Sequence, residues 1–127
     1  MQERKLYSQN VWVENQLQPA TVCLKDGTIT NIHFEQLTAA EDFGNSVIMP
    51  GVIDVHVHIN EPGRTEWEGF ETATQAAAAG GTTTIVDMPL NASPVTTTLP
   101  AFEEKLEASH GQLNVNVGFY AGLIPGN

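Results

Sequence analysis

The first third of the chain consists of short segments rich in β-branched and aromatic residues. Segments 10–13 and 21–24 have this composition, which favours strands. The pair Asp26-Gly27 is a two-residue hairpin signal, and segment 28–32 alternates apolar and polar residues directly after it. The pattern therefore predicts a small antiparallel β-meander that carries no cluster of catalytic residue types.

From residue 47 onward, apolar strands alternate with helical segments. The pattern predicts strands at 52–58, 82–87 and 113–120, with helices at 66–79 and 99–109 between them. Strands and helices that alternate at this spacing indicate βαβ units and a parallel sheet.

The ends of the two predicted helices carry recognisable signals. Thr65 is expected to cap the first helix, with Glu68 at the third helical position as in a capping box. Gly80-Gly81 is expected to end that helix. For the second helix, Thr97 or Thr98 is the expected cap and Pro100 falls in the first turn.

The order of the elements predicts an α/β fold that is only partly present. A closed (β/α)8 barrel takes roughly 250 residues, and about three of its eight units fit into this chain. We therefore expect residues 49–127 to form the truncated first βα units of a TIM-like (β/α)8 barrel. Residues 1–48, which contain the predicted meander, are expected to form a separate segment before it.

The charge balance narrows the range of partners. The chain has 127 residues, with 15 acidic and 5 basic residues, and a net charge of −10. A surface this acidic repels phosphate, so nucleic acid and anionic membranes are not expected partners. Cys23 is the single cysteine and cannot form an internal disulfide. With no signal peptide and no apolar run of about 20 residues, the expected location is cytoplasmic.

The residues with the clearest chemistry are Asp54, His56 and His58, which alternate along the predicted strand 52–58. Successive side chains on a strand point to opposite faces, so these three share one face. Two imidazoles placed in this way can converge on one metal ion, and neutral imidazole is a good zinc ligand. A His-x-His pair also arises by chance without a metal. The carboxyl-end position of His58 favours the metal site, because sites in βα folds lie at that end of the strands.

Residues 49–58, with the sequence MPGVIDVHVH, resemble the first barrel strand of the amidohydrolase superfamily. This superfamily includes dihydroorotases, hydantoinases, dihydropyrimidinases and allantoinases. Residues 61–72 are similar to the allantoinase group, and so is the segment 87–91, DMPLN. Dihydroorotases typically run from this proline straight to an asparagine. The resemblance is strong over residues 47–127. It implies that residues 1–48 form the family's N-terminal β-sandwich segment, which they match only in their strand-rich texture.

The resemblance implies two divalent metal ions per full-length subunit, with zinc as the expected metal and a small-molecule cyclic amide as substrate. His56 and His58 match the paired histidines that bind one of the metals. The family's carboxylated lysine, two further histidines and a proton-handling aspartate would lie beyond Asn127, so we expect no catalytic residue within this chain. The full-length form is expected to be a homo-oligomer. Five other residues of the same types do not match the ligand positions: Lys5, Lys25, Lys105, His33 and His110.

Four more residues on the barrel strands or in the loops that follow them are candidates. Arg64 could present its donor fork to a substrate carbonyl, and the alternative is an ion pair with a nearby glutamate, Glu61, Glu66 or Glu68. Asn91 could bind the ring amide, and the alternative is a turn residue. Asp54 and Asp87 are expected to orient the metal-binding histidines or to close turns.

These features favour an N-terminal fragment of an allantoinase, inactive by itself. Its complete form would hydrolyse the cyclic amide of allantoin to allantoate in purine degradation. The amide resists neutral water, which is why a hydroxide held by two metal ions is needed. One alternative is a fragment of a hydantoinase, dihydropyrimidinase or dihydroorotase. An alternative from another class is a non-catalytic truncated isoform or scaffold protein.

Overall fold

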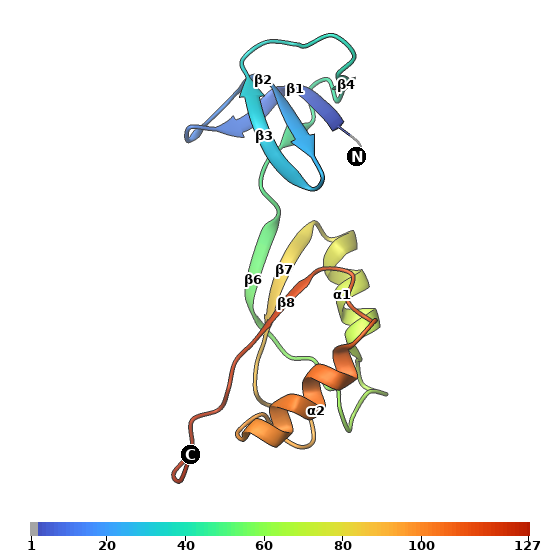
Figure 1. Cartoon of the computed structure of the whole chain (residues 1–127), viewed down its shortest axis with the longest axis vertical. Helices are drawn as coiled ribbons and strands as arrows, with labels where there is room; N and C mark the ends of the chain where they lie inside the picture. The colour runs from blue at the N-terminus through green and yellow to red at the C-terminus, as the bar shows by residue number, and fades with distance from the viewer. Residues whose placement is uncertain (1–2) are drawn as a thin grey trace. The chain divides into compact units, whose positions relative to one another are not determined.

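The computed structural model describes residues 3–127, and Figure 1 shows their helices and strands. The chain separates into two compact units. The first unit ends at Pro50, and the second runs from Gly51 to Asn127. Over residues 3–127, no helix combines the length and apolar character needed to cross a bilayer.

The first unit is built on three antiparallel strands, β1 (Glu3–Val13), β2 (Gln16–Lys25) and β3 (Thr28–His33). The predicted meander is therefore confirmed. Asp26 and Gly27 join β2 to β3 and have φ angles of 50° and 79°, the left-handed values that a type I′ hairpin turn requires. Two short strands, β4 (Glu41–Asp42) and β5 (Val47–Ile48), run parallel to β1 and complete a five-stranded sheet.

The second unit is a three-stranded parallel sheet with two helices. Its elements are β6 (Val52–Val57), α1 (Phe70–Ala79), β7 (Thr82–Asp87), α2 (Leu99–Ser109) and β8 (Asn116–Phe119). The strand order is β6-β7-β8, and both strand pairs are parallel. The predicted βαβ units and parallel sheet are confirmed, although the last strand is shorter than the predicted 113–120. Figure 1 shows both helices on one side of this sheet.

The core of the second unit lies between α1 and the sheet. Ile59, Phe70, Ala73 and Ile85 are buried together there, with at most 8% of each exposed. Phe119 of β8 packs edge-to-face against Phe70, with ring centroids 6.1 Å apart. An edge-to-face pair of this kind adds to the stability gained by burial alone. The core therefore packs α1 against β7, β8 and the end of β6 with the segment that follows it.

The predicted start of the first helix is wrong. Residues 66–69 are not helical, and α1 begins at Phe70 with Gly69 in the N-cap position and no cap from its own side chain. The backbone before it is used in tight turns instead, since Arg64 N–H donates to Asn60 O and Trp67 N–H donates to Arg64 O. The cap comes from a distant residue, because Phe70 N–H donates to Glu61 Oε2 at 2.9 Å.

The second helix matches its prediction. It spans Leu99–Ser109, and the Thr98 hydroxyl accepts a hydrogen bond from Ala101 N–H at 3.4 Å. Thr98, rather than Thr97, is therefore the cap. This helix could be located from sequence because its cap and its proline lie within its own first turn, whereas the cap of α1 is nine residues away in the chain.

Candidate metal and substrate site

The structure brings the two candidate metal ligands together at the carboxyl end of β6. His56 lies on the strand, and His58 follows its last residue, Val57. The ring centroids of His56 and His58 are 5.3 Å apart, and the ring planes are inclined at 58°. The two imidazoles therefore lie side by side without stacking.

This arrangement fits a shared metal ion. Two imidazoles on a tetrahedral zinc, with Zn–N distances of about 2.1 Å, have ring centroids about 5 Å apart. Within residues 3–127, the buried Nδ1 atom of His58 also lacks a hydrogen-bond partner. A buried polar atom is costly without one. No third His, Cys, Asp or Glu of the described residues joins the pair to form a larger candidate metal group.

Asp54 contacts the backbone of a histidine and not its ring. Its side chain is exposed, and its Oδ1 atom accepts a hydrogen bond from His56 N–H at 3.0 Å. The pairing of β6 with β7 shifts register between Asp54 and Val57, so this stretch departs from a regular ladder. The Asp54 side chain therefore provides a hydrogen-bond acceptor for the His56 backbone within this irregular stretch.

Asp87 is fully buried at the end of β7, and both of its oxygens are used. Oδ1 accepts a hydrogen bond from Ile59 N–H at 2.8 Å, and Oδ2 pairs with Lys105 Nζ at 2.5 Å. Burial raises the pKa of the Asp87 carboxyl above its usual range, although the hydrogen bonds from Lys105 and Ile59 favour the charged form. Asp87 therefore links α2 to the residue that follows His58.

Lys105 is the residue of this site that the sequence analysis missed. The sequence excludes it as a metal ligand, because it does not match a ligand position of the family. In the structure it lies on α2. The structure leaves only 1% of it exposed, facing Asp87. The signal that could have found it is its spacing, because the buried residues of α2 are Ala101, Lys105 and Ser109, four residues apart. A lysine within the buried stripe of a helix needs a buried anionic partner.

Arg64 and Asn91 also come together, from the loops after β6 and β7. Arg64 Nη1 donates to the Asn91 carbonyl oxygen at 3.3 Å, and the guanidinium lies 5.0 Å from the centre of the Trp67 ring. Asn91 has a φ angle of 75°, which is the turn conformation considered for it. Within residues 3–127, Arg64 forms no ion pair, so the alternative of a pair with a nearby glutamate is wrong.

The two loops are held together by further close contacts. Ser93 N–H donates to Pro62 O at 2.8 Å, and Met88 N–H donates to Val57 O at 2.7 Å. Gly63 has a φ of 87°, and a Cβ atom there would lie 2.4 Å from Ser93 O, so only glycine fits. The loops after β6 and β7 are therefore held against each other at the carboxyl ends of these strands.

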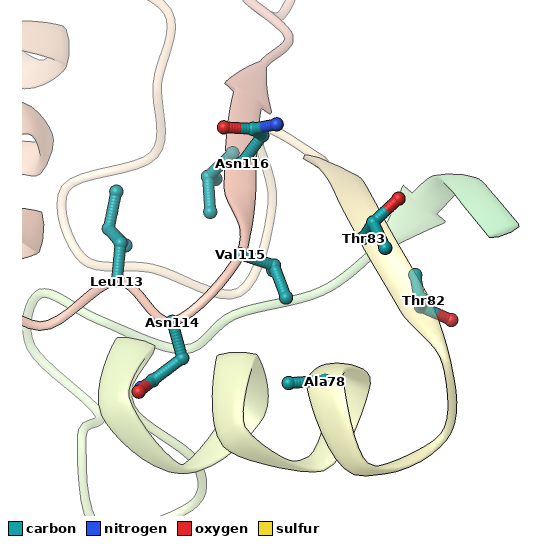
Figure 2. Close-up of a pocket in the computed structure, with 8 residues that line it drawn as sticks. Ala78, Thr82, Thr83, Leu113, Asn114, Val115 and Asn116 are labelled. Carbon is teal, nitrogen blue, oxygen red and sulfur yellow. The ribbon is translucent and has the colours of Figure 1, made fainter. Parts of the chain in front are cut away.

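A cavity of about 760 Å³ in the second unit lies elsewhere. Figure 2 shows residues from the start of β7, the C-terminal part of α1 and the segment that leads into β8 around it. It is therefore at the amino ends of the strands, opposite the histidines. Sites in folds of this kind lie at the carboxyl ends, so this cavity is not the candidate active site. Its lining residues include Ala78, Thr82, Thr83, Leu113, Asn114 and Val115.

The part of the chain that forms the parallel βα units and carries the paired histidines also matches a known protein family in sequence. The model of the Amidohydrolase family matches residues 47–125. This is more than half of the chain, and the chain belongs to this family.

The similar proteins of known identity include several allantoinases. The chain is 63% identical over 87 residues to a probable allantoinase 2 of Dictyostelium discoideum, covering 68% of this chain and 16% of that protein. It is 48% identical over 126 residues to a probable allantoinase of Oryza sativa subsp. japonica, covering 94% of this chain and 25% of that protein. The chain therefore spans a quarter or less of the length of these relatives.

Solved structures of related hydrolases share the fold. The L-hydantoinase (dihydropyrimidinase) from Arthrobacter aurescens superposes with a TM-score of 0.76 at 32% identity, over 97% of this chain and 29% of that chain. A dihydropyrimidinase from Brevibacillus agri superposes with a TM-score of 0.73 at 27% identity, over 94% of this chain and 27% of that chain. The mixed α/β fold with a β-rich N-terminal part is thus the one found in these hydrolases.

Proposed function

We propose that this chain is the N-terminal part of a metal-dependent enzyme that hydrolyses the cyclic amide of allantoin to allantoate. In this proposal, residues 49–127 supply the first βα units of a TIM-like (β/α)8 barrel, and residues 1–48 belong to a β-sandwich. The observation that carries the proposal is the pair His56 and His58, with centroids 5.3 Å apart at the carboxyl end of a parallel strand. The similarity to allantoinases supports the choice of substrate.

His56 and His58 would hold one of two divalent metal ions, for which zinc is the expected element. A divalent ion in such a site activates water and polarises the amide carbonyl. Two carboxylates of this chain would help to orient the imidazoles through the backbone. The Asp54 carboxylate accepts the N–H of His56, and the Asp87 carboxylate accepts the N–H of the residue after His58. The other metal ligands would come from outside this chain.

Arg64 and Asn91 would bind the substrate beside the histidines. The Arg64 guanidinium lies over the Trp67 ring and donates one hydrogen bond to Asn91 O, which leaves its other N–H groups for a carbonyl or ureido oxygen of the substrate. The Asn91 side chain could donate to, and accept from, the ring amide. Both loops are tied together, so the donors are preorganised before the substrate binds.

The test is to assay the complete protein that contains this chain on four cyclic amides: allantoin, hydantoin, dihydrouracil and dihydroorotate. We expect the highest kcat/KM with allantoin. A higher value with hydantoin or dihydrouracil would instead favour the hydantoinase or dihydropyrimidinase activity of the structural neighbours.

The same assay tests the histidine pair. His56→Ala and His58→Ala should each remove bound metal and turnover together, because each takes away a metal ligand. His110→Ala is the matched control, since His110 is exposed at the end of α2, and it should keep both. Normal metal content and turnover in the His56→Ala/His58→Ala double variant would exclude the proposed site.

A further inference from the structure

We infer that Lys105 is a positioning residue for the histidine pair: through Asp87 it fixes the backbone that carries His58. The inference rests on the proposed function for its link to catalysis, and on the contacts of the second unit for its geometry. Lys105 lies on α2 and contacts neither histidine through any hydrogen bond in the described residues. Its effect on His58 must therefore pass through Asp87.

The first step is that His58 lies where the regular sheet has ended. The last residue of β6 is Val57, which is paired with Asp87, and the register between Asp54 and Val57 is irregular. His58 is therefore not held by the repeating ladder that orients side chains within a strand. Its direction depends on the contacts made by its two neighbours in the chain.

Both neighbours, Val57 and Ile59, form hydrogen bonds with residues at the end of β7, and these two hydrogen bonds are called the clamp below. Val57 O accepts a hydrogen bond from Met88 N–H at 2.7 Å, and Ile59 N–H donates to Asp87 Oδ1 at 2.8 Å. The two hydrogen bonds flank His58, one on each side. Their partners are consecutive residues: Asp87, the last residue of β7, and Met88, the first residue of the loop after it. The acceptor of the second hydrogen bond is a side-chain oxygen, since Ile59 lies beyond the last paired residue of β6.

Lys105 is what holds this carboxylate in place. Its Nζ atom pairs with Asp87 Oδ2 and lies 3.5 Å from Met88 O, so it contacts both residues that carry the clamp. Lys105 and Asp87 are 1% and 0% exposed, and a charged pair buried this deeply leaves an uncompensated charge if one partner is removed. Without Lys105, Asp87 would turn toward another donor and release Ile59 N–H.

The experiment uses the complete protein that contains this chain, with Lys105→Met as the main variant. Metal affinity is measured by competition for Zn²⁺ with a chromophoric chelator. Loss of a residue that orients a metal ligand typically weakens metal binding by about 10- to 100-fold, and we expect a loss in this range. In the metal-free protein, the Ile59 amide should also exchange its hydrogen faster. Lys25→Met, at an exposed lysine, is the matched control and should change neither quantity.

Two further variants separate positioning from general stability. The double variant Asp87→Asn/Lys105→Met keeps an oxygen that accepts Ile59 N–H and leaves no buried unpaired charge, so it should recover most of the Zn²⁺ affinity. Ile85→Val removes one methylene from the core of β7 without touching the clamp, and it should leave Zn²⁺ affinity unchanged. Zn²⁺ affinity of Lys105→Met equal to that of Lys25→Met would overturn the inference, as would equal losses in Lys105→Met and the double variant.

The outcome for the proposed function is read separately. If the complete protein binds Zn²⁺ and Lys105→Met weakens that binding, but none of the cyclic amides is hydrolysed, the positioning role stands and the proposed function fails. If allantoin is hydrolysed and Lys105→Met behaves like Lys25→Met, the function stands and the positioning role fails.

Discussion

Replacing Glu61 by alanine removes the group that caps α1. In the structure, Glu61 Oε2 accepts the N–H of Phe70, the first residue of α1, and Glu61 Oε1 accepts a bond from Gln112 Nε2 at 3.4 Å. The N-cap residue Gly69 has no side chain that could take over this role. We therefore expect Glu61→Ala to leave the first N–H of α1 without a partner and to loosen the loop that carries Arg64.

The size of the effect follows from two contributions. Loss of an N-terminal cap costs about 0.5–2 kcal/mol, and loss of a carboxylate at the positive end of a helix costs about 0.3–1 kcal/mol more. The sum, about 1–3 kcal/mol, corresponds to a roughly 5- to 150-fold larger population of the opened helix start, and hydrogen exchange there should be faster by the same factor. Glu61→Gln keeps an oxygen acceptor and loses only the charge, so we expect hydrogen exchange at the helix start to be faster by about two- to fivefold.

The measurement is hydrogen exchange of the α1 amides in the complete protein. Thr65→Ala and Glu68→Ala are the informative comparison, because these two residues form the capping box predicted from the sequence. Both side chains are exposed and, within residues 3–127, neither donates or accepts a capping hydrogen bond at the start of α1, so each variant should change the exchange rate by about twofold or less. If either variant accelerated exchange as much as Glu61→Ala, or if Glu61→Ala had no effect, the structural account of this helix would be refuted.

Two other predictions follow from the candidate site. Arg64→Ala in the complete protein should lower kcat/KM for allantoin by about tenfold or more while bound metal stays unchanged, since Arg64 contacts the loop of Asn91 and not the histidines; loss of metal would assign it another role. The 127-residue chain alone should not hydrolyse allantoin or bind a metal pair, because a catalytic zinc normally has three protein ligands and only His56 and His58 are in position; a soluble monomer with two metals per chain and measurable turnover would refute this.

The sequence was sufficient for features that depend on neighbouring residues. The hairpin at Asp26-Gly27 and the helix capped by Thr98 each have their signals within a few positions, and both were predicted correctly. The two-residue period of a strand also predicts that His56 and His58 lie near each other, and their ring centroids are 5.3 Å apart although His58 follows the last residue of β6. These are local rules that tertiary contacts did not override.

Contacts between distant residues could not be predicted in this way. Glu61 caps a helix that starts nine residues later, and Lys105 pairs with a carboxylate 18 residues before it. No periodic pattern encodes either pairing, because both depend on how the loops fold back over the strand ends. The predicted capping box at Thr65 and Glu68 was wrong for the same reason, because the backbone of residues 60–67 forms hydrogen-bonded turns instead of the first turn of the helix.

The exposure of β6 links the metal site to the rest of the proposed barrel. Val52, Ile53 and Val55 are 51%, 62% and 55% exposed, although strands of parallel sheets are normally buried on both faces. His56 lies on this same strand, and its backbone N–H donates a hydrogen bond to Asp54 Oδ1. In a closed barrel, further strands would cover these apolar side chains and bring the remaining ligands to the same end. Metal binding and burial of β6 should therefore be acquired together, because the contacts that would complete one also complete the other.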